Sequence, residues 1–121
     1  MSTVALTAAT FNSTIADNDI VLVDFWAEWC GPCRAFGPIY EEVSSNHPDV
    51  VFGKVDTEAE QELGAQFQIM SIPTLMIIRD GVIIFSQPGV LPPAALEDLI
   101  SQARALDMDE VRSKVAAHNH G

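Results

Sequence analysis

An apolar run over residues 20–27, interrupted only by Asp24, limits the fold of this chain more than any other segment. A run of this kind is typical of a strand covered on both faces, because a strand with one face in water alternates apolar and polar residues. It therefore predicts a strand at the centre of a sheet. An isolated buried carboxylate is costly, so Asp24 is expected to have a raised pKa or compensating partners.

The rest of the chain alternates between strand-like and helix-like segments, which favours a layered α/β domain with some parallel pairing. Asp80-Gly81 suits the two-residue type I′ turn of a β-hairpin. The predicted fold is therefore α/β, with a central mixed β-sheet flanked by helices on both faces. Further strands are predicted over residues 4–6, 50–55, 74–79 and 82–85, and helices over 8–16, 58–67, 92–103 and a segment that begins beside the two cysteines.

Length and charge narrow the possible functions. The 121 residues match the usual size of one domain. Six Lys and Arg against seventeen Asp and Glu give a net charge of -11, which would repel a phosphate backbone, so neither nucleic acid nor an anionic membrane is expected as a partner. No apolar run approaches the ~20 residues of a membrane span, and the first residues lack the pattern of a signal peptide. We therefore expect a cytoplasmic protein.

The two cysteines of the chain, Cys30 and Cys33, are separated only by Gly31 and Pro32. A purely structural disulfide is one interpretation, but a loop of about four residues would stabilise the fold by only about 2 kcal/mol. A zinc site is another, but tetrahedral zinc needs four ligands, and only three histidines accompany the pair. We expect no metal site.

The position of the pair between a buried strand and a helix favours redox chemistry. Unpaired N–H groups and the dipole at a helix N-terminus stabilise a thiolate, so Cys30 is the predicted nucleophile. Cys33 lies one helical turn further on and is expected to be less exposed. It is the predicted resolving thiol, which attacks the mixed disulfide and releases a reduced product.

The string Trp29-Cys30-Gly31-Pro32-Cys33 resembles the active-site motif of the thioredoxin family. This resemblance implies a thioredoxin fold over residues 1–105 and a thiol-disulfide oxidoreductase that reduces protein disulfides. It also implies that no cofactor is bound and that electrons come from NADPH through thioredoxin reductase. Relatives that act as oxidants carry a histidine inside the motif, whereas this chain has Gly-Pro, which favours a reductant. The similarity extends to residues 23–28, Lys54-Val55-Asp56, Ile72-Pro73-Thr74 and Gly89, and covers roughly residues 4–103.

The resemblance also implies roles for individual residues. Asp24 would assist proton transfer at Cys33 with Lys54 close by, although a carboxylate held only by backbone hydrogen bonds is the alternative. Pro73 would be cis and face the dithiol, against the usual preference of X-Pro bonds for trans. A substrate-docking surface would comprise Trp29, Gly31, Pro32, Ile72, Pro73, Gly89 and Val90, whose alternative interpretation is ordinary surface hydrophobicity.

The chain departs from the family pattern around one predicted helix and at its C-terminal end. Gly64 lies inside the helix, Gln68 stands where many members have glycine, and Met70-Ser71 replaces a frequent Arg-Gly, which affects the expected client preference. Residues 106–121 have no counterpart in short members. They are predicted to form a short helical extension with a frayed tail over 118–121.

Two classes of function follow from these features. The first is a monomeric reductase whose partners are thioredoxin reductase and disulfide-containing client proteins. The second is a binding module or subunit that keeps the fold without redox turnover. The pair of thiols together with Asp24 and Pro73 favours the enzyme, because a module used only for binding has no need of both thiols.

Overall fold

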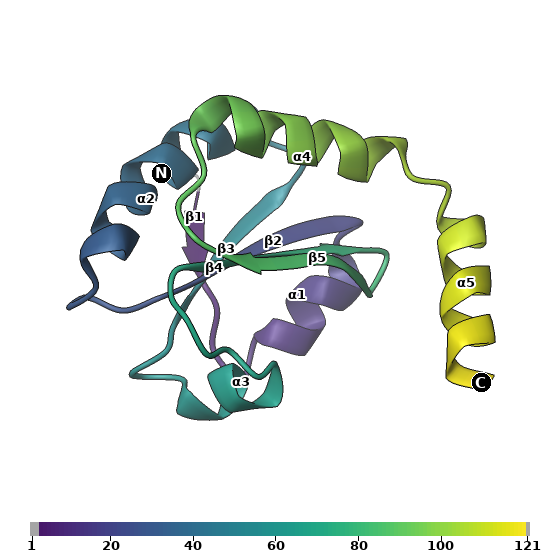
Figure 1. Ribbon diagram of the computed structural model, residues 1–121, viewed down its shortest axis with the longest axis horizontal. Helices are drawn as coiled ribbons and strands as arrows, with labels where there is room; N and C mark the ends of the chain where they lie inside the picture. Colours follow the sequence, from purple (N-terminus) through teal and green to yellow (C-terminus); the bar gives the residue numbers. More distant parts are fainter. Residues whose placement is uncertain (1–2, 121) are drawn as a thin grey trace.

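A computed structural model describes residues 3–120 and the side chains of residues 3–116. Five strands form one sheet, which has helices on both faces (Figure 1). The predicted fold class is confirmed. The strands are β1 (Thr3–Ala5), β2 (Ile20–Trp26), β3 (Val51–Asp56), β4 (Thr74–Arg79) and β5 (Val82–Pro88), and the helices are α1 (Phe11–Asp17), α2 (Gly31–Ser44), α3 (Gln61–Gln66), α4 (Pro93–Ala105) and α5 (Met108–His120).

The apolar run of the sequence forms β2, the middle strand of the order β1-β3-β2-β4-β5. Strand β2 pairs in parallel with β3 and antiparallel with β4, so the sheet is mixed. Strands β4 and β5 form a hairpin whose turn residues Asp80 and Gly81 have φ values of 52° and 79°. Positive φ at both positions is the requirement of the predicted type I′ turn.

Alternate residues of β2 enter two different cores. Leu22 packs with residues of α2 and α4 on one face, whereas Val23 and Phe25 pack with residues of α1 and α3 on the other (Figure 1). Successive side chains of a strand point to opposite faces. Asp24 therefore points to the face of the sheet that α2 covers, which is the helix that carries the cysteines.

Several element boundaries differ from those predicted. Helix α1 begins at Phe11, because the backbone N–H groups of Thr10 and Phe11 donate to the Thr7 carbonyl in a preceding turn. Helix α3 begins at Gln61, because the Asp56 carboxylate accepts from the backbone of Glu58 and Ala59 and holds that segment in a turn. Strand β5 continues to Pro88 rather than residue 85. At the start of α3, the hydrogen bonds between the Asp56 side chain and the backbone compete with helix formation.

The C-terminal helix α5 lies beyond the β4–β5 turn, at the edge of the molecule (Figure 1). The Asp107 carboxylate accepts from the backbone of Asp109 and Glu110 and so caps the helix. Met108 is buried, and Arg112 forms an ion pair of 3.5 Å with Asp80. The helix includes residues 118–120, which were expected to fray, and Gly121 lies outside the described residues.

Helix α3 ends in a Schellman motif centred on Gln68. The backbone N–H of Ile69 donates to the Gly64 carbonyl at 2.9 Å, and that of Gln68 donates to the Ala65 carbonyl at 3.1 Å. This arrangement requires a left-handed residue after the helix, a position usually taken by glycine. Gln68 has φ 55°, so the expectation of positive φ at this residue is confirmed.

Substitutions at Gly64 and Gln68, which depart from the family pattern, are expected to stabilise the protein. Gly64→Ala should raise the free energy of unfolding by about 1 kcal/mol, because glycine in a helix interior is less favourable than alanine. The added methyl would meet only a Thr57 methyl, at 4.0 Å. Gln68→Gly should contribute about 1 kcal/mol by relieving strain at positive φ. Denaturant titration measures both changes, and an unaltered midpoint would contradict either. Gln66→Gly, inside the helix, is the control expected to destabilise.

Candidate active site

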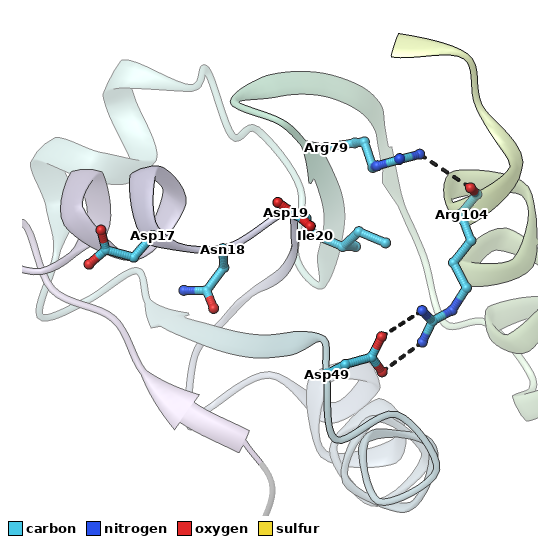
Figure 2. Close-up of a pocket in the computed structure, with 7 residues that line it drawn as sticks. All are labelled: Asp17, Asn18, Asp19, Ile20, Asp49, Arg79 and Arg104. Atoms are coloured by element: carbon cyan, nitrogen blue, oxygen red, sulfur yellow. Dashed lines mark hydrogen bonds and ion pairs between the residues drawn. The ribbon is translucent and has the colours of Figure 1, made fainter.

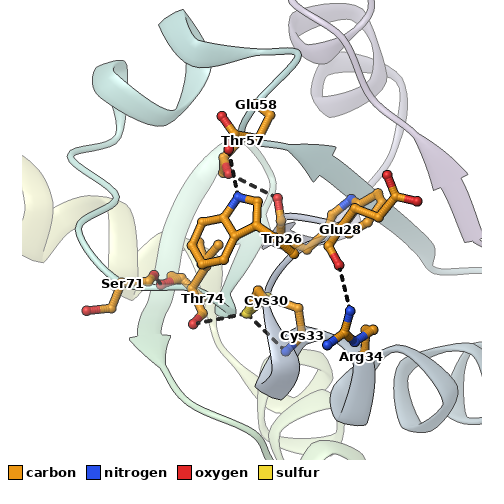
Figure 3. The surroundings of a disulfide bond; sticks show 11 residues. Trp26, Glu28, Cys30, Cys33, Arg34, Thr57, Glu58, Ser71 and Thr74 are labelled. Carbon is orange, nitrogen blue, oxygen red and sulfur yellow. Dashed lines mark hydrogen bonds between the residues drawn. A yellow bond between two sulfur atoms is a disulfide. The ribbon is translucent and has the colours of Figure 1, made fainter.

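Cys30 and Cys33 lie at the start of α2 and are joined by a disulfide bond (Figure 3). Cys30 has extended backbone angles and occupies the N-cap position, which places Gly31 and Pro32 in the exposed first turn. The backbone N–H of Cys33 donates to the Sγ atom of Cys30 at 3.2 Å. A sulfur at this position receives one of the unpaired N–H groups of the helix, together with the favourable end of the helix dipole.

The sulfur atoms belong to a small apolar cluster that also contains Ala27, with Trp26 and Ile72 packed against it. The Sγ atom of Cys30 lies 3.7 Å from the Ile72 carbonyl oxygen. Cys30 and Cys33 are each only 4% exposed. The expectation that Cys33 is the less exposed of the two is wrong, because the loop carrying Ile72 covers Cys30.

The Ile72-Pro73 peptide bond is cis, as the resemblance implied. Pro73 is buried, and its carbonyl accepts a hydrogen bond of 2.9 Å from the backbone N–H of Gly89. Gly89 has φ 115°, a conformation that favours glycine. The structure therefore joins Gly89 to Pro73 and places Ile72 beside Cys30, whereas Val90, 40% exposed, follows Gly89 on the surface.

Asp24 is completely buried, and neither of its carboxylate oxygens has a hydrogen-bond partner among the described residues. The alternative of a carboxylate held by backbone hydrogen bonds is therefore wrong. Burial raises the pKa of Asp24 from 3.8 to about 7, and the positive charge of Lys54 opposes part of this increase. Lys54 is the neighbour of Asp24 in the β2–β3 register, and its Nζ atom lies 4.6 Å from the Trp26 ring centroid.

Trp29 is 66% exposed, and its indole N–H donates to Glu58 at 2.6 Å. Glu58 was not among the residues predicted for this site. The two residues are 29 positions apart, and no sequence pattern links them. The turn that delays the start of α3 positions Glu58, so this partnership depends on tertiary structure.

A pocket separate from the cysteines lies at the start of β2 and is lined by both acidic residues and arginines (Figure 2). Arg104 binds both carboxylate oxygens of Asp49, at 2.7 and 2.9 Å, and lowers the pKa of Asp49 to about 2. Arg79 donates to the Ala103 carbonyl at 2.6 Å. These interactions join the start of β3 and the end of β4 to α4, and none of the residues belongs to the predicted site.

Within residues 3–120, no helix is long and apolar enough to cross a membrane. In the same range, His, Cys, Asp and Glu side chains form no group of three or more that could hold a metal ion.

Known proteins match this chain over most of its length. The thioredoxin family model matches residues 2–102. A putative thioredoxin 2 of Streptomyces coelicolor is 64% identical over 115 residues, which are 95% of this chain and 86% of that protein. A Plasmodium falciparum thioredoxin structure has a TM-score of 0.75 and 37% identity, covering 83% of this chain and 97% of its own.

A further structure concerns the thiol resolving mechanism in yeast mitochondrial 1-Cys peroxiredoxin via glutathione/thioredoxin systems. It has a TM-score of 0.76 and 31% identity, and the match covers 84% of this chain and 95% of that one.

A disulfide that spans four residues contributes little to stability, so its position at a helix start beside an apolar surface indicates chemistry. Proteins built in this way are thiol-disulfide oxidoreductases. The family match and the identities above narrow the class further. The chain belongs to the thioredoxin family and reduces disulfides of client proteins, and this family needs no bound cofactor. The family and activity expected from the sequence are confirmed.

Proposed function

We propose that Cys30 attacks client disulfides and Cys33 resolves the product. The Cys30 thiolate bonds to one client sulfur, and the client's other sulfur leaves as a thiolate that takes a proton from water. The Cys33 thiolate then attacks the Cys30 sulfur, forms the Cys30–Cys33 disulfide and releases the second client thiolate. Two electrons pass from the dithiol to the client.

The hydrogen bond from the Cys33 backbone to the Cys30 sulfur carries this assignment. A backbone N–H donated at a helix N-terminus favours the charged form of the sulfur that receives it. Only Cys30 occupies the N-cap position. The equal exposure of the two residues does not distinguish them, so the direction of this hydrogen bond supports Cys30 as the nucleophile.

Asp24 is proposed to accept the proton of Cys33. It points to the face of the sheet that α2 covers, and a pKa of about 7 leaves it partly ionised at neutral pH, as a general base requires. Lys54 would favour the charged form of Asp24, because its positive charge lowers the carboxyl pKa. Asp24 and Lys54 therefore complete the proposed catalytic set.

Clients are proposed to dock on the surface around the disulfide, formed by Trp29, Gly31, Pro32, Ile72, Pro73, Gly89 and Val90. The exposure of Trp29 and Val90 and the closeness of Ile72 to the Cys30 sulfur support this role. We further propose a cytoplasmic monomer, re-reduced by thioredoxin reductase with electrons from NADPH. The similarity to thioredoxins supports this partner.

Insulin reduction tests turnover directly. With dithiothreitol as the electron donor, catalytic amounts of the protein are expected to accelerate the precipitation of insulin chains, because each oxidised molecule is reduced and used again. Precipitation no faster than with dithiothreitol alone would contradict reductase activity and favour the binding module. Replacing dithiothreitol by NADPH and a bacterial thioredoxin reductase tests the proposed electron source.

A further inference from the structure

Two hollows of different chemistry adjoin the exposed Trp29 side chain. One is a groove whose lining includes Ala65, Ile69, Met70 and Ile72. The other is lined by Trp29 and four charged residues, which are Glu28, Arg34, Asp56 and Glu58. Because Trp29 lines both, the indole separates an apolar groove from an acidic pocket next to the disulfide.

The apolar groove extends to Ile72, which packs against the two cysteines. Ile72 lines the groove, and its carbonyl lies 3.7 Å from the Cys30 sulfur. Met70 is 93% exposed, the highest exposure among the large hydrophobic residues described. A flexible thioether of this kind packs against apolar side chains of varied shape. The groove therefore offers a contact for an apolar residue close to a client cysteine.

The acidic pocket has three carboxylates and one guanidinium, and much of its charge is uncompensated. Arg34 donates to the Glu28 backbone carbonyl at 3.3 Å. Glu58 accepts from the Trp29 indole, and Asp56 accepts from backbone N–H groups, so both contacts orient a carboxylate without neutralising it. A client residue that enters this pocket is favoured if it carries a positive charge.

We propose that the site selects client disulfides with a bulky apolar residue on one side of the cysteine and a lysine or arginine on the other. The apolar residue occupies the groove at Met70, and the basic residue lies across Trp29 beside Glu58. This inference rests on the proposed function, because it takes Cys30 as the attacking group. Met70 and Glu58 are the specificity-determining residues.

The test uses short peptides with one cysteine held as a mixed disulfide with thionitrobenzoate, whose release reports the attack. Leu or Gln is placed on one side of the cysteine and Arg or Glu on the other, in both orders. In the order that places each side chain at its matching hollow, the rate of release with Leu should exceed that with Gln by about fivefold, because the Leu side chain is partly buried. The rate of release with Arg should exceed that with Glu by about threefold, the effect of an exposed ion pair. Preferences below twofold in both orders would overturn the proposal.

Two variants assign each preference to its residue. Glu58→Gln keeps an oxygen that can accept from Trp29 and should reduce the preference for Arg while leaving that for Leu. Met70→Gln should have the opposite effect. Glu110→Gln and Val115→Gln, both on α5, remove the same charge and a similar apolar side chain elsewhere and should change neither ratio. A loss of both preferences in either Glu58→Gln or Met70→Gln would overturn the assignment.

Failure of this inference differs from failure of the proposed function. If all peptides release thionitrobenzoate at equal rates, and faster than with Cys30→Ser, Cys30 remains the nucleophile and the selection of clients by their flanking residues is excluded. Release no faster than with Cys30→Ser would contradict the nucleophile itself. Added salt should reduce the preference for Arg and not that for Leu, because salt screens exposed charges.

Discussion

Cys30→Ser is expected to reduce insulin reduction to the rate with dithiothreitol alone, whereas Cys33→Ser is expected to stop after a single attack. Serine at position 30 removes the only sulfur at the N-cap of α2, and a hydroxyl does not exchange with disulfides. Cys33→Ser keeps the N–H that donates to the Cys30 sulfur but lacks the thiol that releases the client. It should therefore accumulate a mixed disulfide.

Mass spectrometry of each variant after incubation with a disulfide client decides between the two roles. The expected adduct on Cys33→Ser has the mass of the protein plus the client, and it disappears on reduction. An equal adduct on Cys30→Ser would contradict the assignment. The wild-type dithiol gives a second check, since Cys30 should be alkylated first at neutral pH.

Asp24→Asn is expected to stabilise the protein at alkaline pH and to have little effect at acid pH. Burial raises the pKa of Asp24 from 3.8 to about 7, so the folded protein holds a proton that the unfolded chain loses between these values. Stability therefore falls as the pH rises through this window and levels off above about 7. Three pKa units correspond to about 4 kcal/mol.

This figure is the upper limit of the gain for the variant. The neutral carboxyl and the amide are both buried without hydrogen-bond partners, so their burial costs of about 1–3 kcal/mol nearly cancel, and Asp24→Asn should gain up to about 4 kcal/mol near pH 8. At about pH 4 the carboxyl of the folded wild type and the amide of the variant are both neutral, so the difference in their free energies of unfolding should vanish. Denaturant titrations of the oxidised proteins at both pH values measure it. A constant difference, or a loss of stability near pH 8, would indicate a structural carboxylate.

The same substitution should slow turnover, because asparagine cannot accept the proton of Cys33. The wild-type rate of the resolving step should rise with pH through about 7, the pKa of Asp24, and this dependence should be absent in Asp24→Asn. Rapid mixing of a preformed mixed disulfide, at several pH values, measures this step. A structural role would lower the rate without changing its pH profile.

The sequence predicted the parts of the molecule that depend on local pattern. The apolar run predicted the central strand and the burial of Asp24, because only a strand covered on both faces is apolar throughout. Asp80-Gly81 predicted its turn, because few residues tolerate positive φ. The position of Cys30 at a helix start followed from the apolar spacing after Cys33, a signal carried by adjacent residues.

Other features depend on contacts between distant segments. The bond between Trp29 and Glu58 and the cover that Ile72 provides for Cys30 join residues about 30 to 40 positions apart. The delayed start of α3 depends on the side chain of Asp56, which accepts from the backbone two and three residues later. Helix propensity does not include such competing bonds, so the boundary was misplaced.

The central position of β2 has a consequence for how the protein fluctuates. Both edges of this strand are hydrogen-bonded, and both faces lie in a core, so its amide hydrogens can exchange with solvent only when the whole domain opens. The short β1 and the turn before α3 can open locally at lower cost. The cysteines follow the strand that opens least often. Each redox cycle therefore takes place at the end of a rigid strand.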